Sequence, residues 1–147
     1  MTQTSNEIFI AAPAQSVYEL AAATEHWPSI LPHYRFVRVL EERPASRVVE
    51  MAARRGVIPV RWTAEQRNDP VRPHIAFHHL RGWTRGMDVE WIFEPVEGGT
   101  RVRIEHRLAF QFPIAREWLG EHVVGNFFIR DVAGKTLACM KQLAEGR

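Results

Sequence analysis

Three polar side chains fall among apolar ones in a pattern that could support proton chemistry: Gln66, His79 and His106. Around His106, charged residues alternate with Val102, Ile104 and His106 itself. Side chains of a β-strand point alternately to its two faces, so the charged residues belong outside and His106 belongs inside. The same alternation places His79 and Gln66 on inward rows. Imidazole titrates near neutral pH, so either histidine could exchange protons with a bound molecule.

The inward rows of the predicted strands form a wide aromatic surface with isolated polar groups. A surface of this kind is typical of a small-molecule pocket. The alternative is a solid core in which each polar side chain bonds to the backbone or to water. Three polar groups on adjacent rows favour a cavity. The inward residues are Trp62, Gln66, Ile75, Phe77, His79, Met87, Val89, Trp91, Phe93, Ile104 and His106.

Seven strands are predicted to carry these rows. The last six are separated by short segments rich in Gly, Asn, Asp and Pro, which are turn residues. Connections this short require antiparallel neighbours, because a parallel pair needs a crossover of about a dozen residues. The predicted strands cover residues 7–11, 34–41, 47–53, 57–67, 74–80, 86–94 and 101–110.

Two short helices are predicted between the first two strands. Pro13 suits the first turn of a helix over 15–22, because its missing N–H is not needed there. Thr24 is expected to cap a second helix, which runs through Trp27 and Leu31 and ends at Pro32.

A long helix is predicted over 121–145, after a loop over 112–120. From Ile129 onward, small and apolar residues recur every three or four positions, which predicts one face packed on the sheet. Phe127 and Phe128 project from nearly the opposite side, toward a lid or a cavity. The predicted fold is α+β, in the order β-α-α-β6-α: a seven-stranded curved antiparallel sheet wrapped around this helix, with an interior cavity.

Composition excludes several classes of protein. The chain has 147 residues, 46% of them hydrophobic and 24% charged, which suits one globular domain over 1–147. Its 19 basic and 17 acidic residues are spread along the chain, so no basic patch for nucleic acid is expected. Neither a signal peptide nor an integral membrane segment is apparent, which predicts a cytoplasmic protein. Cys139 is the single cysteine, and no zinc motif is apparent.

The other histidines have less informative positions. His26, His33 and His122 lie near predicted helix or strand ends and are expected to be solvated. His74 and His78 belong on the outer face of their strand. Trp83 lies between two glycines and is a candidate for a loop at the mouth of the pocket.

These elements, in this order, resemble the helix-grip superfamily of START-type lipid carriers and Bet v 1-like proteins (SRPBCC). The nearest likeness is to the polyketide cyclase/dehydrase branch, the single-domain aromatase/cyclases of bacterial aromatic polyketide synthesis. It covers nearly the whole chain. The segments that carry it are Ala12-Pro13 with Val17-Tyr18, Glu25-His26-Trp27-Pro28, Tyr34, Arg61-Trp62, Met87 to Trp91, and Glu97-Gly98-Gly99-Thr100.

The resemblance implies a mechanism without metal or organic cofactor. A poly-β-ketone delivered by an acyl carrier protein would enter the pocket, close a ring by an aldol reaction and lose water. Catalytic roles would fall to His79, His106 and Tyr34, with Tyr34 or Gln66 donating a hydrogen bond to the developing oxyanion. Substrate-binding positions would be Trp27, Trp62, Gln66, Phe77, Met87, Trp91, Phe93 and Phe128.

Two positions depart from the pattern of that family. Its cyclases place an arginine inside the pocket on the strand after the tryptophan, and this place falls on Gln66, or on the adjacent Arg67 if a bulge intervenes. A second inward arginine of the family falls on His79. These changes leave a non-catalytic alternative open: a carrier or sensor for a hydrophobic molecule such as a quinone or a lipid. Either function suits a monomer or a homodimer.

Overall fold

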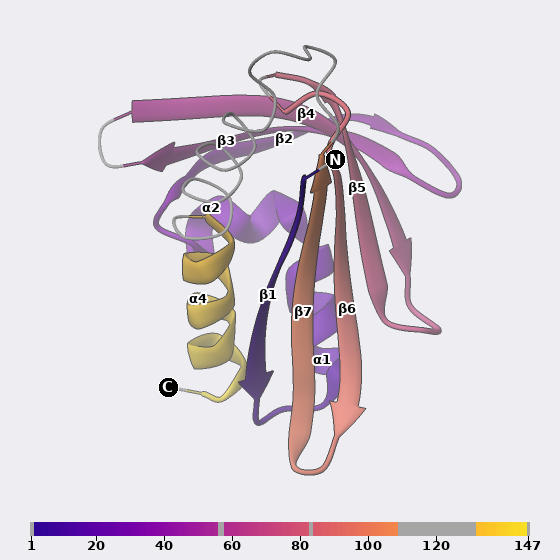
Figure 1. Cartoon of the computed structure of the whole chain (residues 1–147), viewed down its shortest axis with the longest axis vertical. Coiled ribbons are helices and arrows are strands. Elements are labelled where there is room, and N and C mark those ends of the chain that lie inside the picture. Colours follow the sequence, from indigo (N-terminus) through magenta and orange to yellow (C-terminus); the bar gives the residue numbers. More distant parts are fainter. Residues whose placement is uncertain (1, 56–57, 83, 109–131, 147) are drawn as a thin grey trace.

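A seven-stranded antiparallel sheet forms the frame of the molecule, with strand order β1-β7-β6-β5-β4-β3-β2 (Figure 1). The computed structural model describes residues 2–55, 58–82, 84–108 and 132–146. The elements are β1 (Thr2–Ile10), α1 (Ala14–Ala22), the 3₁₀ turn η1 (Thr24–His26), α2 (Trp27–Ile30), β2 (Tyr34–Glu42), β3 (Arg47–Arg55), β4 (Ile58–Asp69), β5 (His74–Arg81), β6 (Asp88–Val96), β7 (Gly99–Leu108) and α4 (Gly134–Ala144).

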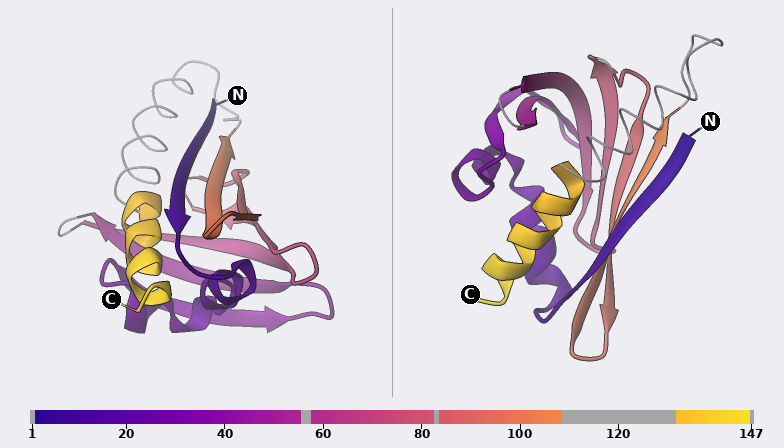
Figure 2. Two further views of the ribbon diagram at one scale, coloured as in Figure 1. Left: turned by 90° about the horizontal axis from the view of Figure 1, so that it is seen from below. Right: turned by 60° about the vertical axis from the view of Figure 1, so that its left-hand side comes forward.

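The sheet curves strongly, so that β2, β3 and β4 run across the direction of β1 and β7 (Figure 2). The helices α1, α2 and α4 lie on its concave side, and α4 packs against β1 and α1. This arrangement confirms the predicted sheet wrapped around a C-terminal helix. Of the predicted helix over 121–145, residues 121–131 lie outside the described residues, as does the predicted loop over 112–120.

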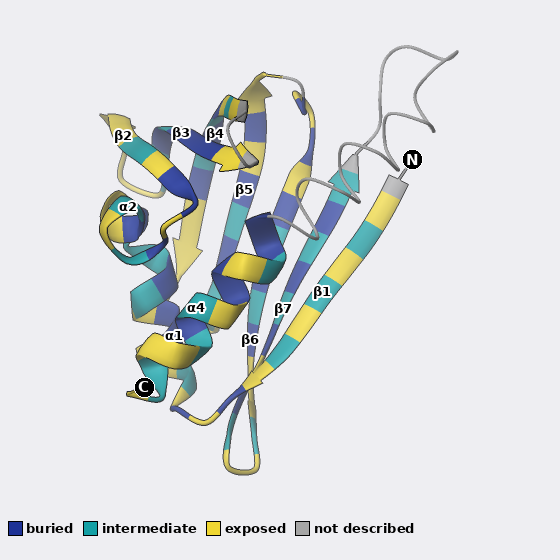
Figure 3. Ribbon diagram, turned by 90° about the vertical axis from the view of Figure 1, so that its left-hand side faces the viewer, coloured by how far each residue is buried: buried dark blue, intermediate teal, exposed yellow. Residues whose placement is uncertain are grey.

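Burial alternates along β5, β6 and β7 as the sequence pattern requires (Figure 3). On the outer face, Arg107 and Glu90 form an ion pair across β7 and β6 with a 2.6 Å N–O distance. Pairs as exposed as this one stabilise a fold by about 1 kcal/mol or less, so the buried row carries most of the energy. The strict period of two is what directs His79 and His106 to the inside.

Two local predictions are wrong. The first strand is longer than the predicted 7–11, because β1 pairs with β7 in continuous register from Thr2 to Ile10. The polar residues before Glu7 give no apolar signal, but a strand needs only backbone pairing along its length. Thr24 does not cap a helix: no side-chain cap bond is formed there, and its hydroxyl donates to Gln66 instead.

A close approach of two backbones joins β1 to the start of β7. A Cβ atom added at Gly99 would collide with the carbonyl oxygen of Ile10, so this position requires glycine. The adjacent Thr100 hydroxyl donates to the carbonyl of Ala12 at 2.7 Å. These contacts hold the chain as it leaves β1 for α1, and thereby set where α1 crosses the sheet.

Candidate functional site

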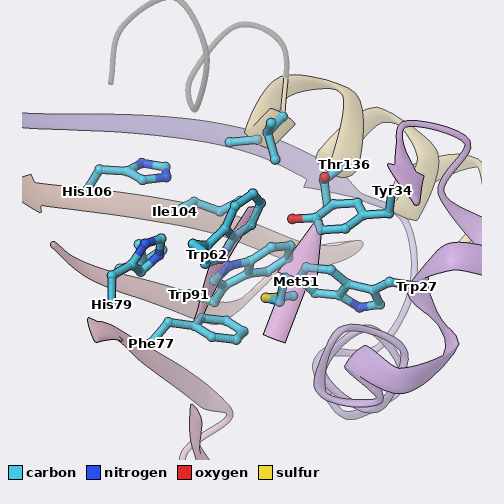
Figure 4. Close-up of a pocket in the computed structure, with 13 residues that line it drawn as sticks. Trp27, Tyr34, Met51, Trp62, Phe77, His79, Trp91, Ile104, His106 and Thr136 are labelled. Carbon is cyan, nitrogen blue, oxygen red and sulfur yellow. The ribbon is translucent and has the colours of Figure 1, made fainter. Parts of the chain in front are cut away.

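A small cavity lies between the concave side of the sheet and α4, with a volume of about 40 Å³ (Figure 4). Its aromatic walls are Trp27, Tyr34, Trp62, Phe77 and Trp91, and its aliphatic walls are Met51, Val89, Ile104, Val132 and Ala133. Three polar side chains line it as well: His79, His106 and Thr136. The described residues therefore combine an apolar enclosure with two imidazoles and two hydroxyls.

The aromatic side chains pack against one another at one end of the cavity. The rings of Trp27 and Tyr34 lie 5.0 Å apart between centroids and at 71°, an edge-to-face arrangement. Trp27 also lies 5.7 Å from Trp91, and Tyr34 lies 6.2 Å from Trp62. Such aromatic pairs add about 1 kcal/mol each beyond simple burial. They hold the walls in defined positions.

His79, on β5, lies at the other end of the cavity, beside His106 (Figure 4). Its ring stacks on Trp62 with a centroid distance of 5.8 Å and an interplanar angle of 5°. Its Nδ1 atom lies 2.7 Å from the hydroxyl oxygen of Thr84, a residue of the β5–β6 turn. Burial lowers the pKa of His79 to about 3, with a further contribution from the nearby His106. The imidazole is therefore neutral at physiological pH.

His106, on β7, is equally buried, and burial lowers its pKa to about 4. Because each imidazolium would repel the other, the two rings accept one proton more readily than two. Tyr34 differs in sign: burial raises the pKa of its phenol above the ordinary value of 10. Its hydroxyl, which Figure 4 shows directed toward Trp62 rather than toward Trp27, therefore stays protonated and can donate a hydrogen bond.

Gln66 is buried but is not among the residues that line this cavity. Its carbonyl oxygen accepts from the Thr24 hydroxyl at 2.8 Å and from Arg47 Nε at 3.3 Å. Its amide nitrogen donates to the carbonyl of Ala22 at 3.0 Å. These bonds join β3 and β4 to the end of α1. Arg67 is exposed, so Gln66 is the residue that points inward at this place on β4. There it takes part in the hydrogen bonds just described and does not line the cavity.

Two more predicted substrate-binding residues differ from the expectation, and a third is not described. Met87 and Phe93 are buried but do not line the cavity among the described residues. Phe93 packs edge-on against Tyr18 of α1, with ring centroids 5.7 Å apart. Phe128 lies outside the described residues, as do His122 and Trp83. The remaining predicted residues, Trp27, Trp62, Phe77 and Trp91, all lie on the cavity.

His33 was expected to be solvated, and this prediction is wrong. Its side chain is buried, and its Nε2 atom lies 2.8 Å from the Thr136 hydroxyl oxygen, joining the α2–β2 connection to α4. Burial, with repulsion from Lys135, lowers the pKa of His33 to about 4. His26, by contrast, is exposed as expected. Both histidines lie near the ends of short helices, and nothing in the sequence distinguishes the buried His33 from the exposed His26.

Four residues that line the cavity were named neither in the inward rows nor as substrate-binding positions: Met51, Val132, Ala133 and Thr136. Met51 lies on β3, where Val48, Val49, Ala52 and Ala53 are buried as well, so burial on that strand does not follow a simple alternation. Thr136 belongs to the stripe of α4 that was predicted to face the sheet. Among the described residues, no cluster of three or more His, Cys, Asp or Glu side chains is placed to hold a metal ion.

Comparison with known proteins identifies the family. Residues 10–141 match the family model described as polyketide cyclase/dehydrase and lipid transport. The chain belongs to this family. The bifunctional cyclase/dehydratase of the actinorhodin polyketide synthase from Streptomyces coelicolor is 31% identical over 138 residues, which are 92% of this chain and 42% of that protein. The chain thus spans less than half the length of this relative.

Solved structures confirm the helix-grip fold of this polyketide cyclase/dehydrase family member. TTHA0849 from Thermus thermophilus superposes with a TM-score of 0.82 at 22% identity, covering 99% of this chain and 98% of that one. The Zhui aromatase/cyclase from Streptomyces sp. R1128 gives 0.80 at 24% identity, covering 99% and 94%. In the family member described here, none of the helices among the described residues is long and apolar enough to span a membrane.

Proposed function

We propose that the chain is an aromatase/cyclase that binds a carrier-tethered poly-β-ketone and promotes its regiospecific aldol cyclisation and dehydration. The observation that carries this proposal is the pair of neutral imidazoles, His79 and His106, on an aromatic cavity that the protonated Tyr34 side chain also lines. Membership of the polyketide cyclase/dehydrase family supports it. The partner in this proposal is a cytoplasmic acyl carrier protein.

The proposed reaction needs four proton movements. A neutral imidazole removes a proton from a carbon between two ketones, and the Tyr34 hydroxyl donates a hydrogen bond to the enolate oxygen that forms. The enolate carbon then attacks a second ketone, and the resulting alkoxide takes a proton to become a hydroxyl group. The alkoxide takes this proton from the imidazolium, which becomes neutral again. The imidazole then removes the second proton from the same carbon and passes it to the hydroxyl group, which leaves as water as the double bond forms. The sequence consumes no oxidant and releases one water per ring closure.

A lowered histidine pKa is compatible with this role. The burial that keeps His79 and His106 neutral disfavours an isolated imidazolium, but proton transfer from substrate creates an enolate next to it. In a site of low dielectric the attraction within that pair amounts to several kcal/mol and offsets the penalty of burial. The imidazole is thus a weak base in the empty site and a stronger one once the substrate is bound.

The size of the cavity sets a requirement on binding. A volume of about 40 Å³ holds a few water molecules, whereas ligand pockets usually enclose several hundred Å³ (~300 or more). A poly-β-ketone must therefore displace side chains that line the cavity. Trp62 stacks on His79 and also packs against Tyr34, so its movement would open space between the aromatic end and the imidazoles.

Reconstitution with a minimal polyketide synthase tests the proposal. Products formed with the wild-type protein, with His106→Ala and with His26→Ala would be compared by liquid chromatography and mass spectrometry. The wild type and the exposed-site control His26→Ala should give one ring pattern, and His106→Ala should return the mixture formed without the protein. An identical mixture with and without the wild-type protein would refute the cyclase function.

A second function is supported by the apolar lining and by the lipid-transport part of the family description. A non-catalytic carrier for a quinone or a lipid would use the same cavity without proton transfer. Native mass spectrometry of the purified protein separates the two cases. A stoichiometric hydrophobic ligand that stays bound, together with unchanged polyketide products, would favour the carrier.

A further inference from the structure

Thr84 is a buried polar residue that the proposed reaction does not yet use. It lies in the turn between β5 and β6, flanked by Gly82 and Gly86, whose φ angles of 106° and 92° bring the turn back over the end of β5. Backbone bonds from Gly86 N to His79 O and from His79 N to Met87 O, each 2.9 Å, close this turn. The Thr84 side chain is 1% exposed, and its hydroxyl reaches His79 Nδ1.

The partners of the Thr84 hydroxyl determine which of the two groups donates in this hydrogen bond. Among the described residues, His79 Nδ1 is the single hydrogen-bond partner of the Thr84 hydroxyl. If Nδ1 carried the proton, the hydroxyl would accept it and its own O–H would be left buried without an acceptor. A buried unsatisfied donor costs about 1–3 kcal/mol, whereas a spare lone pair on a hydroxyl oxygen is common. The Thr84 hydroxyl therefore donates, and Nδ1 accepts.

We propose that Thr84 is a positioning residue that holds His79 in the tautomer with its proton on Nε2. His79 then presents an N–H donor to a ketone or enolate oxygen of the substrate, and His106 is the group that accepts the proton from carbon. This assignment rests on the proposed cyclase function and deepens it. A neutral imidazole can polarise a carbonyl in this way while a different group acts as the base. The stacking of His79 on Trp62 fixes the plane of the ring, and Thr84 fixes its tautomer.

Nitrogen NMR of the imidazole rings tests the tautomer without any assay of activity. In wild-type protein labelled with ¹⁵N-histidine, His79 should show a protonated Nε2 and an unprotonated Nδ1. Thr84→Ser keeps the hydroxyl and should give the same spectrum. Thr84→Val keeps the shape and removes the donor, so the two ring shifts should move toward each other, as in a mixture of tautomers. A wild-type spectrum with protonated Nδ1, or an unchanged spectrum in Thr84→Val, would overturn the proposal.

Kinetics on the reconstituted system test the role of the donor. Thr84→Val should lower kcat about tenfold with KM nearly unchanged, because a donor that acts on the developing oxyanion affects the transition state most. Thr84→Ser should restore the rate. His79→Gln, which keeps an N–H donor and cannot act as a base, should retain more activity than His79→Ala. Equal losses in those two variants would contradict the donor role, while a wild type without any cyclisation activity would refute the proposed function and leave the tautomer result standing.

Discussion

Lowering the pH from 7 to 5 should destabilise the folded protein strongly, because three described histidines are buried in the neutral form. The pKa values of His33 and His106 lie at about 4 and that of His79 at about 3, against 6.5 for the unfolded chain. The unfolded state therefore binds more protons than the folded state between pH 6.5 and 4. Their stabilising contribution is complete above pH 6.5 and is lost as the pH falls through this window.

The size of the effect follows from the pKa differences. At pH 5 an unfolded histidine is almost fully protonated and a folded one with a pKa near 4 is almost fully neutral, which corresponds to about 2 kcal/mol for each residue. The three residues together should lower the free energy of unfolding by about 6 kcal/mol relative to pH 7. Small domains have roughly 5–15 kcal/mol in total, so the protein should approach its unfolding midpoint.

Urea denaturation at pH 7, 6 and 5, followed by tryptophan fluorescence, measures this dependence. His33→Gln should show a drop smaller by about 2 kcal/mol, since it removes one titrating group and keeps an amide that can bond to Thr136. His26→Gln, at an exposed position, should follow the wild type. The pH range ends at 5 because Glu25, whose pKa its hydrogen bond to Arg47 lowers, contributes stability that is lost only below about pH 4.5. A free energy of unfolding that is flat within about 1 kcal/mol from pH 7 to 5 would refute the buried neutral state.

Three substitutions away from the reacting groups test the frame of the site by denaturation. Gln66→Leu should lower the free energy of unfolding by about 2 kcal/mol, because it removes the hydrogen-bond partner of the Thr24 hydroxyl. The ring pattern of the products should stay the same, and a changed ring pattern would mean that Gln66 contacts the substrate. Thr136→Val should cost about 1–2 kcal/mol because His33 loses its bond, and an unchanged stability would mean that water replaces the hydroxyl. Gly99→Ala should cost ~3 kcal/mol or more through its collision with the Ile10 carbonyl, whereas Gly99→Ala with wild-type stability would mean that β1 can shift.

Most of the fold was predictable because one face of its strands is exposed to solvent. A period of two with charges on one side determines which residues are buried, and the short connections determine that the neighbours are antiparallel. The inward rows of β5, β6 and β7, including His79 and His106, follow directly from this pattern. The start of β1 did not follow, because its polar residues pair through the backbone alone and leave no apolar signal.

The candidate site was less predictable, because side chains on the concave face of a strongly curved sheet point to different parts of the interior. Gln66 and His79 both point to the concave side, but Gln66 lies near the end of β4 against α1, and His79 lies near His106 on the cavity. Alternation alone treats the two positions as equivalent. The end of α1 places the backbone carbonyl of Ala22 against the Gln66 amide, so Gln66 belongs to a hydrogen-bond network outside the aromatic cavity.

The chemical state of each imidazole is set by contacts that no periodic pattern contains. His79 meets Thr84 through a turn bent by two glycines, and His33 meets Thr136 across more than a hundred residues of chain. Both histidines are neutral, yet the first borders the cavity and the second joins the α2–β2 connection to α4. A buried neutral histidine is therefore a candidate hydrogen-bond donor to the substrate when a hydroxyl partner fixes its tautomer and its ring still lines the cavity. His79 meets both conditions. The residue at position 84 should therefore affect the reaction through His79, although it is itself buried.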